Sequence, residues 1–215
     1  MQDINKTSTK SQILQAAREL FSEYGYSRVS MRDIAERLGI SVGNLTYHFH
    51  RKEDLIEAIV DEMQNARNKS LSPPTDLYEL DMLISKNAET ITRNICYFRD
   101  YTQFSHLSKK IHNIQREMID YHFSLWRKVF YNLNKAGFII DEVYEGQFEN
   151  LITAILLTTR HWSSHAKLAE DFGYEFTDLR DCIWSLIFPI LTKKGQDLYL
   201  NKIKNNKEHS CNKQI

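Results

Sequence analysis

The chain of 215 residues contains only seven glycines and three prolines. These two residues mark loops and turns, and folds built from many strands need many turns. A chain so poor in both is expected to form long helices joined by few loops. Its apolar residues agree, because they recur three or four positions apart along most of the sequence. We therefore predict an all-α protein with about nine helices.

Charge and composition narrow the class of protein further. Lys and Arg number 28, as do Asp and Glu, so the chain is not a uniformly basic nucleic-acid binder. Residues 1–52, however, hold eight Lys and Arg against five Asp and Glu, a local excess that would attract phosphate. The three cysteines form no closely spaced motif, the first residues lack an apolar leader, and the apolar runs are short for a membrane span. We expect a cytoplasmic protein with no membrane contact.

The proline pair at 73–74 cannot continue a helix, so residues 68–75 are the best candidate for a linker between domains. We predict an N-terminal domain over 1–55, a connecting helix at about 51–68, and a larger helical domain over 69–205. The polar residues 206–215 are expected to form a disordered tail. Within the larger domain, a helix is expected at about 76–101. The last one, 177–200, should be interrupted near Ser185 by Pro189.

Two short helices, 30–38 and 41–49, are expected to meet at a tight turn. Ser30 and Ser41 stand where N-caps belong, Asp33 completes an approximate capping box with Ser30, and Gly39 ends the first helix. Short helices joined by a glycine-containing turn predict a helix-turn-helix, whose second helix enters the DNA major groove. The apolar side chains expected in its core are Leu38, Ile40, Leu45 and Phe49.

The run SMRDIAERLGISVGNLTYHFHRKEDLIEAI closely resembles the DNA-binding segment of the TetR family of bacterial transcriptional regulators. The preceding run, ILQAARELFSEYGY, resembles that family's first helix. The resemblance covers residues 9–56, and beyond residue 65 only the length and the helical pattern agree. It implies a three-helix DNA-binding head, a larger C-terminal bundle for ligand binding and dimerisation, and a repressor that a small ligand releases from its operator.

The residues expected at the DNA interface follow from chemistry and from this resemblance together. An asparagine pairs with an adenine edge, a valine packs on a thymine methyl, and a glycine lets the backbone approach. Tyrosine, histidine and lysine donate to phosphate oxygens, and an arginine reaches either target. Thr46 departs from the tyrosine common in the family, which would weaken one phosphate contact or shift it to the next residue. The predicted DNA-binding residues are Arg32, Val42, Gly43, Asn44, Tyr47, His48 and Lys52.

The resemblance also predicts a homodimer that reads a pseudo-palindromic operator in double-stranded DNA. The last two long helices, about 144–165 and 177–200, carry wide apolar stripes that would pair across the two-fold axis. The predicted interface residues are Phe148, Ile152, Ile155, Thr159, Ile183 and Ile187; the alternative is that these faces pack within one subunit. For the ligand cavity the large aromatic residues of the bundle are candidates, and we select Trp126, Phe130 and Trp162. The helix at 51–68 would be the sole covalent bridge through which such a ligand acts on the head.

The sequence gives little support for an enzymatic function. The sequence has no phosphate-cradling glycine loop, no nucleophile elbow and no Glu-x-x-His pair of a di-iron bundle. His161 and His165 lie one helical turn apart, but no carboxylate or cysteine completes a metal site at a convincing spacing. We predict no catalytic residue, metal or cofactor. The alternative to a ligand-released repressor is a helical binding protein, or a DNA binder without a small-molecule inducer.

Overall fold

The computed structural model describes residues 8–67 and 72–204 of the chain. These residues form eleven α-helices and no strand, and one isolated antiparallel bridge joins Ile139 to Leu191. The predicted all-α class is confirmed. The count exceeds nine because two predicted helices are each divided, one at Asn94 and the other around Pro189. The predicted tail, 206–215, lies outside the described residues.

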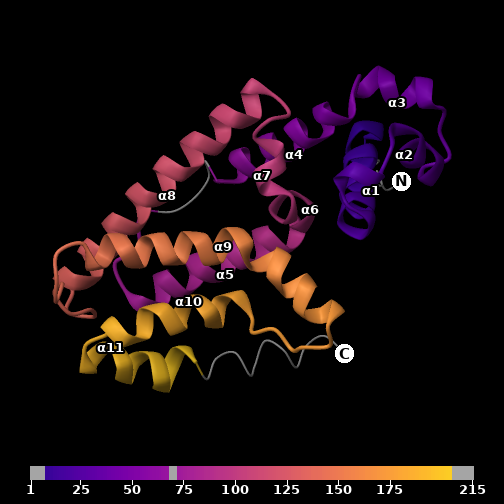
Figure 1. The fold of residues 1–215 in the computed structure, drawn as a ribbon. Helices are drawn as coiled ribbons and strands as arrows, with labels where there is room; N and C mark the ends of the chain where they lie inside the picture. The colour runs from indigo at the N-terminus through magenta and orange to yellow at the C-terminus, as the bar shows by residue number, and fades with distance from the viewer. Residues whose placement is uncertain (1–7, 68–71, 205–215) are drawn as a thin grey trace, which may run out of the picture. The chain divides into compact units, whose positions relative to one another are not determined.

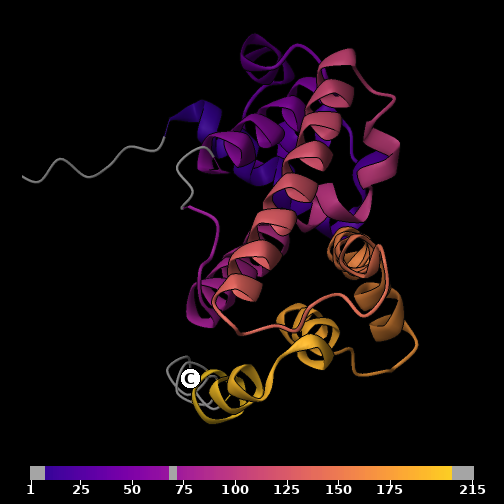
Figure 2. The same cartoon turned by 90° about the vertical axis from the view of Figure 1, so that its left-hand side faces the viewer.

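The chain folds as two compact units that do not follow the order of the sequence. Unit 1 combines 1–70 with 92–116, and unit 2 combines 71–91 with 117–215, within the described ranges. The chain therefore passes between the units three times, so the expectation of one covalent bridge is wrong. Two of these passages occur inside helices, α5 (Leu77–Arg93) and α8 (Lys109–Lys135), the second visible as one continuous helix in Figure 2.

Unit 1 begins with the three helices that the sequence predicts, α1 (Thr9–Tyr24), α2 (Met31–Arg37) and α3 (Val42–His48), shown in indigo and purple in Figure 1. A 3-10 turn over Tyr26–Arg28 follows α1. The apolar stripes of these helices are buried together, and they include Ile13, Phe21, Ile34 and Leu45, each fully inaccessible to solvent. This burial of one face per short helix supplies the stability that two-turn helices lack by themselves.

Side-chain caps and one glycine define the turn between α2 and α3. Ser30 forms a capping box with Asp33, as predicted: the Ser30 Oγ accepts from the Asp33 N–H, and the Asp33 carboxylate accepts from the Ser30 N–H. At the other end, the N–H of Gly39 donates to Glu36 O and that of Ile40 to Ala35 O. This paired pattern is a Schellman motif, and it places Gly39 at φ +65°, a conformation that favours glycine.

The remainder of unit 1 holds α1 at its C-terminal end. Helix α4 (Lys52–Arg67) is followed, after the passage through unit 2, by α6 (Ile95–Arg99) and α7 (Tyr101–Phe104). The Arg99 guanidinium donates to the carbonyls of Phe21 and Ser22, which are among the last in α1. The Asp100 carboxylate accepts from the Tyr26 N–H. Residues 92–116 thus complete the N-terminal head, which explains why they group with it.

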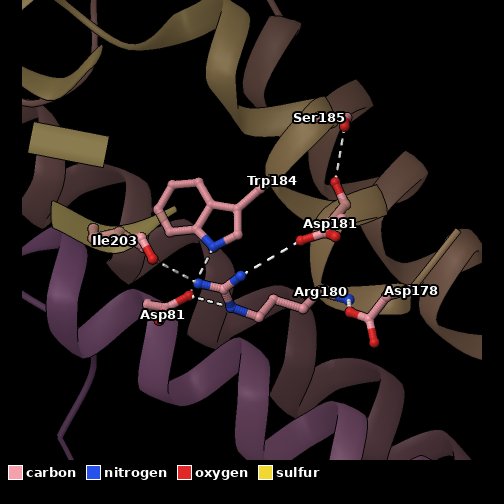
Figure 3. A network of polar contacts seen from close by, with 7 residues as sticks. All are labelled: Asp81, Asp178, Arg180, Asp181, Trp184, Ser185 and Ile203. Atoms are coloured by element: carbon pink, nitrogen blue, oxygen red, sulfur yellow. Dashed lines mark hydrogen bonds and ion pairs between the residues drawn. The ribbon is translucent and has the colours of Figure 1, made fainter. Parts of the chain in front are cut away.

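Unit 2 contains most of α5 and α8, then α9 (Gln147–Asp171) and α10 (Leu179–Ile187). A polar network fixes α10 to α5 (Figure 3): the Arg180 Nε donates to Asp81 Oδ1 at 2.7 Å, and the Trp184 Nε1 donates to the same oxygen at 2.9 Å. The Arg180 guanidinium also reaches the carbonyl of Ile203. One aspartate therefore satisfies two buried donors from the next-to-last helix.

The end of unit 2 confirms the predicted interruption. Helix α10 stops at Ile187, a 3-10 turn spans Phe188–Ile190, and the chain is extended at Leu191 before α11 (Lys193–Leu198) and a π-helical turn (Tyr199–Ile203). Proline has no N–H to donate, so a helix cannot continue regularly through Pro189. Among the described residues, no helix is long and apolar enough to span a membrane.

Candidate functional site

Helix α3 is held by its inner face. Leu45 and Phe49 are 0% and 4% exposed, so the two side chains fix the helix on the core of unit 1, as predicted. The Ser41 Oγ accepts from the Asn44 N–H at 3.1 Å, which confirms its N-cap role. Leu38 and Ile40, also predicted as core, are only half-buried because they lie in the turn.

The outer face of α3 is free for contact with another molecule. Tyr47 is 81% exposed and Val42 is 41% exposed, while Gly43 and Asn44 are also exposed. The half-buried His48 ring meets the Tyr47 ring edge to face at 5.2 Å. A helix that leaves such donors, acceptors and apolar groups in water has the composition that reads base edges in a major groove. The structure thus brings five of the seven predicted DNA-binding residues onto one exposed helix.

Thr46, the departure from the family pattern, is occupied within the helix. Its Oγ1 donates to the Gly43 carbonyl at 3.2 Å. The short side chain does not extend beyond the helix surface as a tyrosine would, whereas the neighbouring Tyr47 side chain is 81% exposed.

Two arginines of unit 1 that precede α3 in the chain are exposed. Arg32, near the start of α2, is exposed, as predicted. Arg28, in the 3-10 turn, is likewise exposed, and neither takes part in an ion pair among the residues that the structure describes. Sequence reasoning passed over Arg28, whose only signal was its charge. Both guanidiniums are available to bind phosphate oxygens.

Lys52 is the first residue of α4, as predicted, and its ammonium is bonded within unit 1. Its ammonium donates to the carbonyls of Tyr26 and Val29, both at 2.9 Å, and stands 4.1 Å from the centre of the Tyr26 ring. Burial lowers the pKa of Lys52 from its ordinary value. The side chain joins the start of α4 to the turn after α1, because two carbonyls and an aromatic face satisfy it there. An ammonium has three N–H donors, so these two bonds leave one donor for a further acceptor.

Five of the six residues predicted for a dimer interface belong to the core of the single chain. Phe148 alone is half-buried, and its ring packs on Phe130 at 5.2 Å. The stripe therefore packs within the subunit, the alternative that the sequence left open. The buried residues are Ile152, Ile155, Thr159, Ile183 and Ile187.

The three aromatic candidates for a ligand cavity do not form one cluster. Trp126 and Phe130 are adjacent on α8, with ring centres 5.7 Å apart, and both are buried. Trp162 lies on α9, where its Nε1 donates to the Thr177 carbonyl at 2.9 Å. The ring from α9 that meets Phe130 is Phe148.

Other candidate sites are weaker. A hollow of about 390 Å³ lies between α1 and the end of α2, but its lining is largely exposed and polar, including Gln12, Gln15 and Arg37. His161 and His165 are both exposed. Within 8–67 and 72–204, no three His, Cys, Asp or Glu side chains lie close enough together to hold a metal ion.

Comparison with known proteins gives two family models that match in succession. Residues 13–59 match the model of bacterial regulatory proteins of the tetR family, and residues 56–199 match a bacterial transcriptional repressor model. Over 77 residues the chain is 38% identical to the HTH-type transcriptional regulator UidR of Escherichia coli K12. The aligned segment covers 35% of this chain and 39% of that protein. The match thus spans about two fifths of this relative's length.

A longer match, 28% identical over 198 residues, links 86% of the chain to all of IcaR, the negative regulator of the biofilm operon icaADBC of Staphylococcus aureus Newman.

Among solved structures, a TetR-family transcriptional regulator from Marinobacter aquaeolei VT8 has the same fold, with a TM-score of 0.76 and 22% identity, over 90% of this chain and 96% of that one. A transcriptional regulator from Saccharomonospora viridis, solved in complex with choline, has a TM-score of 0.61 and 18% identity, over 86% and 98% of the two chains. Because the repressor model alone matches more than half of the residues, the chain belongs to the TetR family of bacterial transcriptional regulators.

Proposed function

We propose that the protein is a sequence-specific DNA-binding repressor that acts in the cytoplasm, where the chromosome lies. The observation that carries this proposal is the exposed outer face of α3. Val42, Asn44 and Tyr47 project from a helix that Leu45 and Phe49 anchor from behind. IcaR, which matches over its full length, is named as a negative regulator, and this supports repression rather than activation.

The protein acts on DNA as a homodimer, because one recognition helix buries little surface and two of them read a pseudo-palindrome. The buried stripe of α9 is unavailable for this contact, so we assign the interface to the opposite face of that helix. Leu157 is 57% exposed and Leu168 51% exposed, and the smaller Ala154 and Ser164 share their face. Apolar and small side chains on one exposed helix face are suited to close helix packing.

A small ligand taken up by unit 2 controls the DNA affinity. Support comes from the choline complex of the S. viridis regulator, which shares this fold. Operator half-sites lie about 34–36 Å apart, so a shift of a few ångström between two recognition helices misaligns one of them. The ligand must favour the misaligned state by roughly 1–3 kcal/mol, a common coupling energy. Three passages of the chain between the units, rather than α4 alone, carry that coupling.

The test begins with the operator. DNA fragments retained by the purified protein from its host genome would be sequenced, and affinity for the recovered site measured with parent and variants. Asn44→Ala should cost about 1–3 kcal/mol on this site and little on random DNA. Asn201→Ala, at an exposed position in unit 2, serves as the control. Equal operator binding by Asn44→Ala and the parent would exclude α3 as the reading helix.

The dimer assignment has its own measurement. Sedimentation of the parent at micromolar concentration should give twice the chain mass of 25.4 kDa. Leu157→Glu should give single chains, because a buried unpaired carboxylate opposes association. Leu200→Glu, at a residue 41% exposed outside α9, should remain dimeric. A parent that sediments as one chain would refute the dimer.

A further inference from the structure

The start of α1 brings a lysine to one end of α3, the helix that the proposed function places in the major groove. Lys10 lies in the first turn of α1, and its ammonium nitrogen stands 5.4 Å from the centre of the Phe49 ring. Phe49 is the C-cap of α3 and is 4% exposed, so its ring is fixed in the core of unit 1. Two residues far apart in the sequence therefore hold a positive charge beside the last turn of α3.

The charge of Lys10 is available to another molecule. The residue is exposed and forms no ion pair among the residues that the structure describes. Neither the first turn of α1 nor any position of α3 carries an acidic side chain. An aromatic ring attracts a cation through its quadrupole but has no net charge. The Phe49 ring therefore holds the ammonium in place without neutralising it.

The position of Lys10 along α3 decides which part of DNA it meets. The N-terminal residues of a recognition helix contact base edges, and Lys10 lies at the opposite end. Helix α3 has seven residues, which at about 1.5 Å per residue gives a length of roughly 10 Å. The major groove is about 12 Å wide, so the far end of such a helix lies near the phosphates that line the groove. An ammonium at this end meets a phosphate oxygen rather than a base.

We propose that Lys10 of each subunit binds a backbone phosphate of the operator, at the flank of the half-site that α3 reads. The contact extends the DNA surface from α3 to the start of α1. It fixes the register of the head on the duplex and carries no sequence information, because phosphates are alike at every step. The inference rests on the proposed function, because it adds a contact to the same DNA complex.

A purely structural role for Lys10 would have a different signature. Lys10→Met keeps an unbranched apolar side chain over the Phe49 ring and removes only the charge. An exposed cation–π contact contributes little to stability, so the unfolding temperature should fall by a few degrees at most. A lysine that only supports α3 would not change the salt dependence of DNA binding, whereas a phosphate contact must. The salt dependence is therefore the decisive measurement.

The test uses the full-length protein with two labelled duplexes, the recovered operator and a scrambled sequence, at several sodium chloride concentrations. Lys10→Met should lower the slope of log affinity against log salt by about 0.9 per subunit, and weaken binding at low salt at least about fivefold. Both duplexes should lose affinity by the same factor. Lys10→Arg should keep the parent slope, because a guanidinium also packs over an aromatic ring and binds phosphate. Lys86→Met, which removes an exposed lysine of α5 in unit 2, is the matched control and should also keep it.

Three results would overturn the inference. An unchanged slope in Lys10→Met would show that the ammonium meets no phosphate. An equal reduction in Lys86→Met would attribute the effect to the overall charge of the protein. A loss confined to the operator would place Lys10 on a base edge. Operator binding by the parent with a slope that Lys10→Met does not change rejects the Lys10 contact alone, whereas a parent that does not prefer the operator over the scrambled duplex rejects the proposed function.

Discussion

Adding one methyl group at Gly43 tests how closely the backbone of α3 approaches DNA. A Cβ built on this residue would have the Ser41 Oγ as its nearest neighbour, at 3.9 Å, so the free protein has room for a methyl group. Gly43→Ala should leave the free energy of unfolding unchanged or raise it by up to about 1 kcal/mol, because alanine favours a helix. Operator affinity should fall by about tenfold or more, the equivalent of 1.4 kcal/mol of lost contact.

Gly195→Ala is the contrasting variant, because there the added methyl group has no room. Its Cβ would lie 2.4 Å from the Phe138 carbonyl oxygen, so this variant should lose about 1–3 kcal/mol of stability through overpacking. Thermal unfolding and titration of labelled operator give the two quantities. Undiminished operator affinity in Gly43→Ala would show that the backbone of α3 stays away from the bases.

We expect Lys52 to contribute more to stability than to DNA affinity. Lys52→Met removes the donor to two carbonyls, and the free energy of unfolding should fall by about 1–3 kcal/mol. The salt dependence of operator binding should stay as in the parent. Arg28→Met, by contrast, should lower that slope by about one per subunit without affecting stability. Urea unfolding and binding at several salt concentrations separate the two roles; a reduced slope in Lys52→Met would return the residue to the phosphate contacts.

The contrast between Ser41 and Lys52 shows which residue roles can be predicted from sequence. The bond of Ser41 reaches three residues along the chain, so spacing alone predicted it. The bonds of Lys52 reach back 26 and 23 residues to backbone carbonyls, which have no sequence signature. The contact between His122 and Arg160, 38 positions apart, has no sequence signature either.

At the scale of elements, the Asp81 carboxylate links α5 to α10 (Figure 3). Asp81→Leu leaves the Arg180 guanidinium and the Trp184 N–H without this acceptor, and should cost roughly 2–3 kcal/mol, somewhat below a fully buried pair because Asp81 is 24% exposed. Asp81→Asn keeps an oxygen for Trp184 and should cost less. Asp181→Asn, whose carboxylate lies 3.4 Å from Arg180, should change little. Urea unfolding orders the three variants, and equal losses for all three would contradict a central role for Asp81.

The spacing of apolar residues predicted where the helices lie. The sequence predicted only some of the breaks in those helices and little of which helix packs against which. Pro189 has a fixed chemical effect, so the break after α10 was predicted. The break at Asn94 was not, because asparagine is compatible with a helix and its burial against Arg18 depends on the folded unit. An apolar stripe shows that a face is buried but not against which neighbour. The residues assigned to a dimer, such as Ile152 and Ile187, are for that reason core.

At the scale of the whole molecule, the three passages of the chain make unit 1 dependent on a distant segment. A fragment of residues 1–70 lacks Arg99 and Asp100, which bond to the end of α1 and to the turn after it. It should show weak helicity and no cooperative unfolding by circular dichroism. A fragment of residues 1–116 restores those contacts and should unfold cooperatively. Equal cooperativity in both fragments would show that 92–116 is dispensable.

The same connectivity bears on how DNA specificity can be exchanged between relatives. A chimera that joins residues 1–70 of this chain to the remainder of another regulator would receive a recognition helix but a foreign segment in place of 92–116. A residue of the other regulator would then have to replace Arg99 as the donor to the Phe21 and Ser22 carbonyls. Successful grafts should therefore carry both stretches together, and natural recombination within the first 70 codons should be tolerated only between parents whose later segments are already compatible.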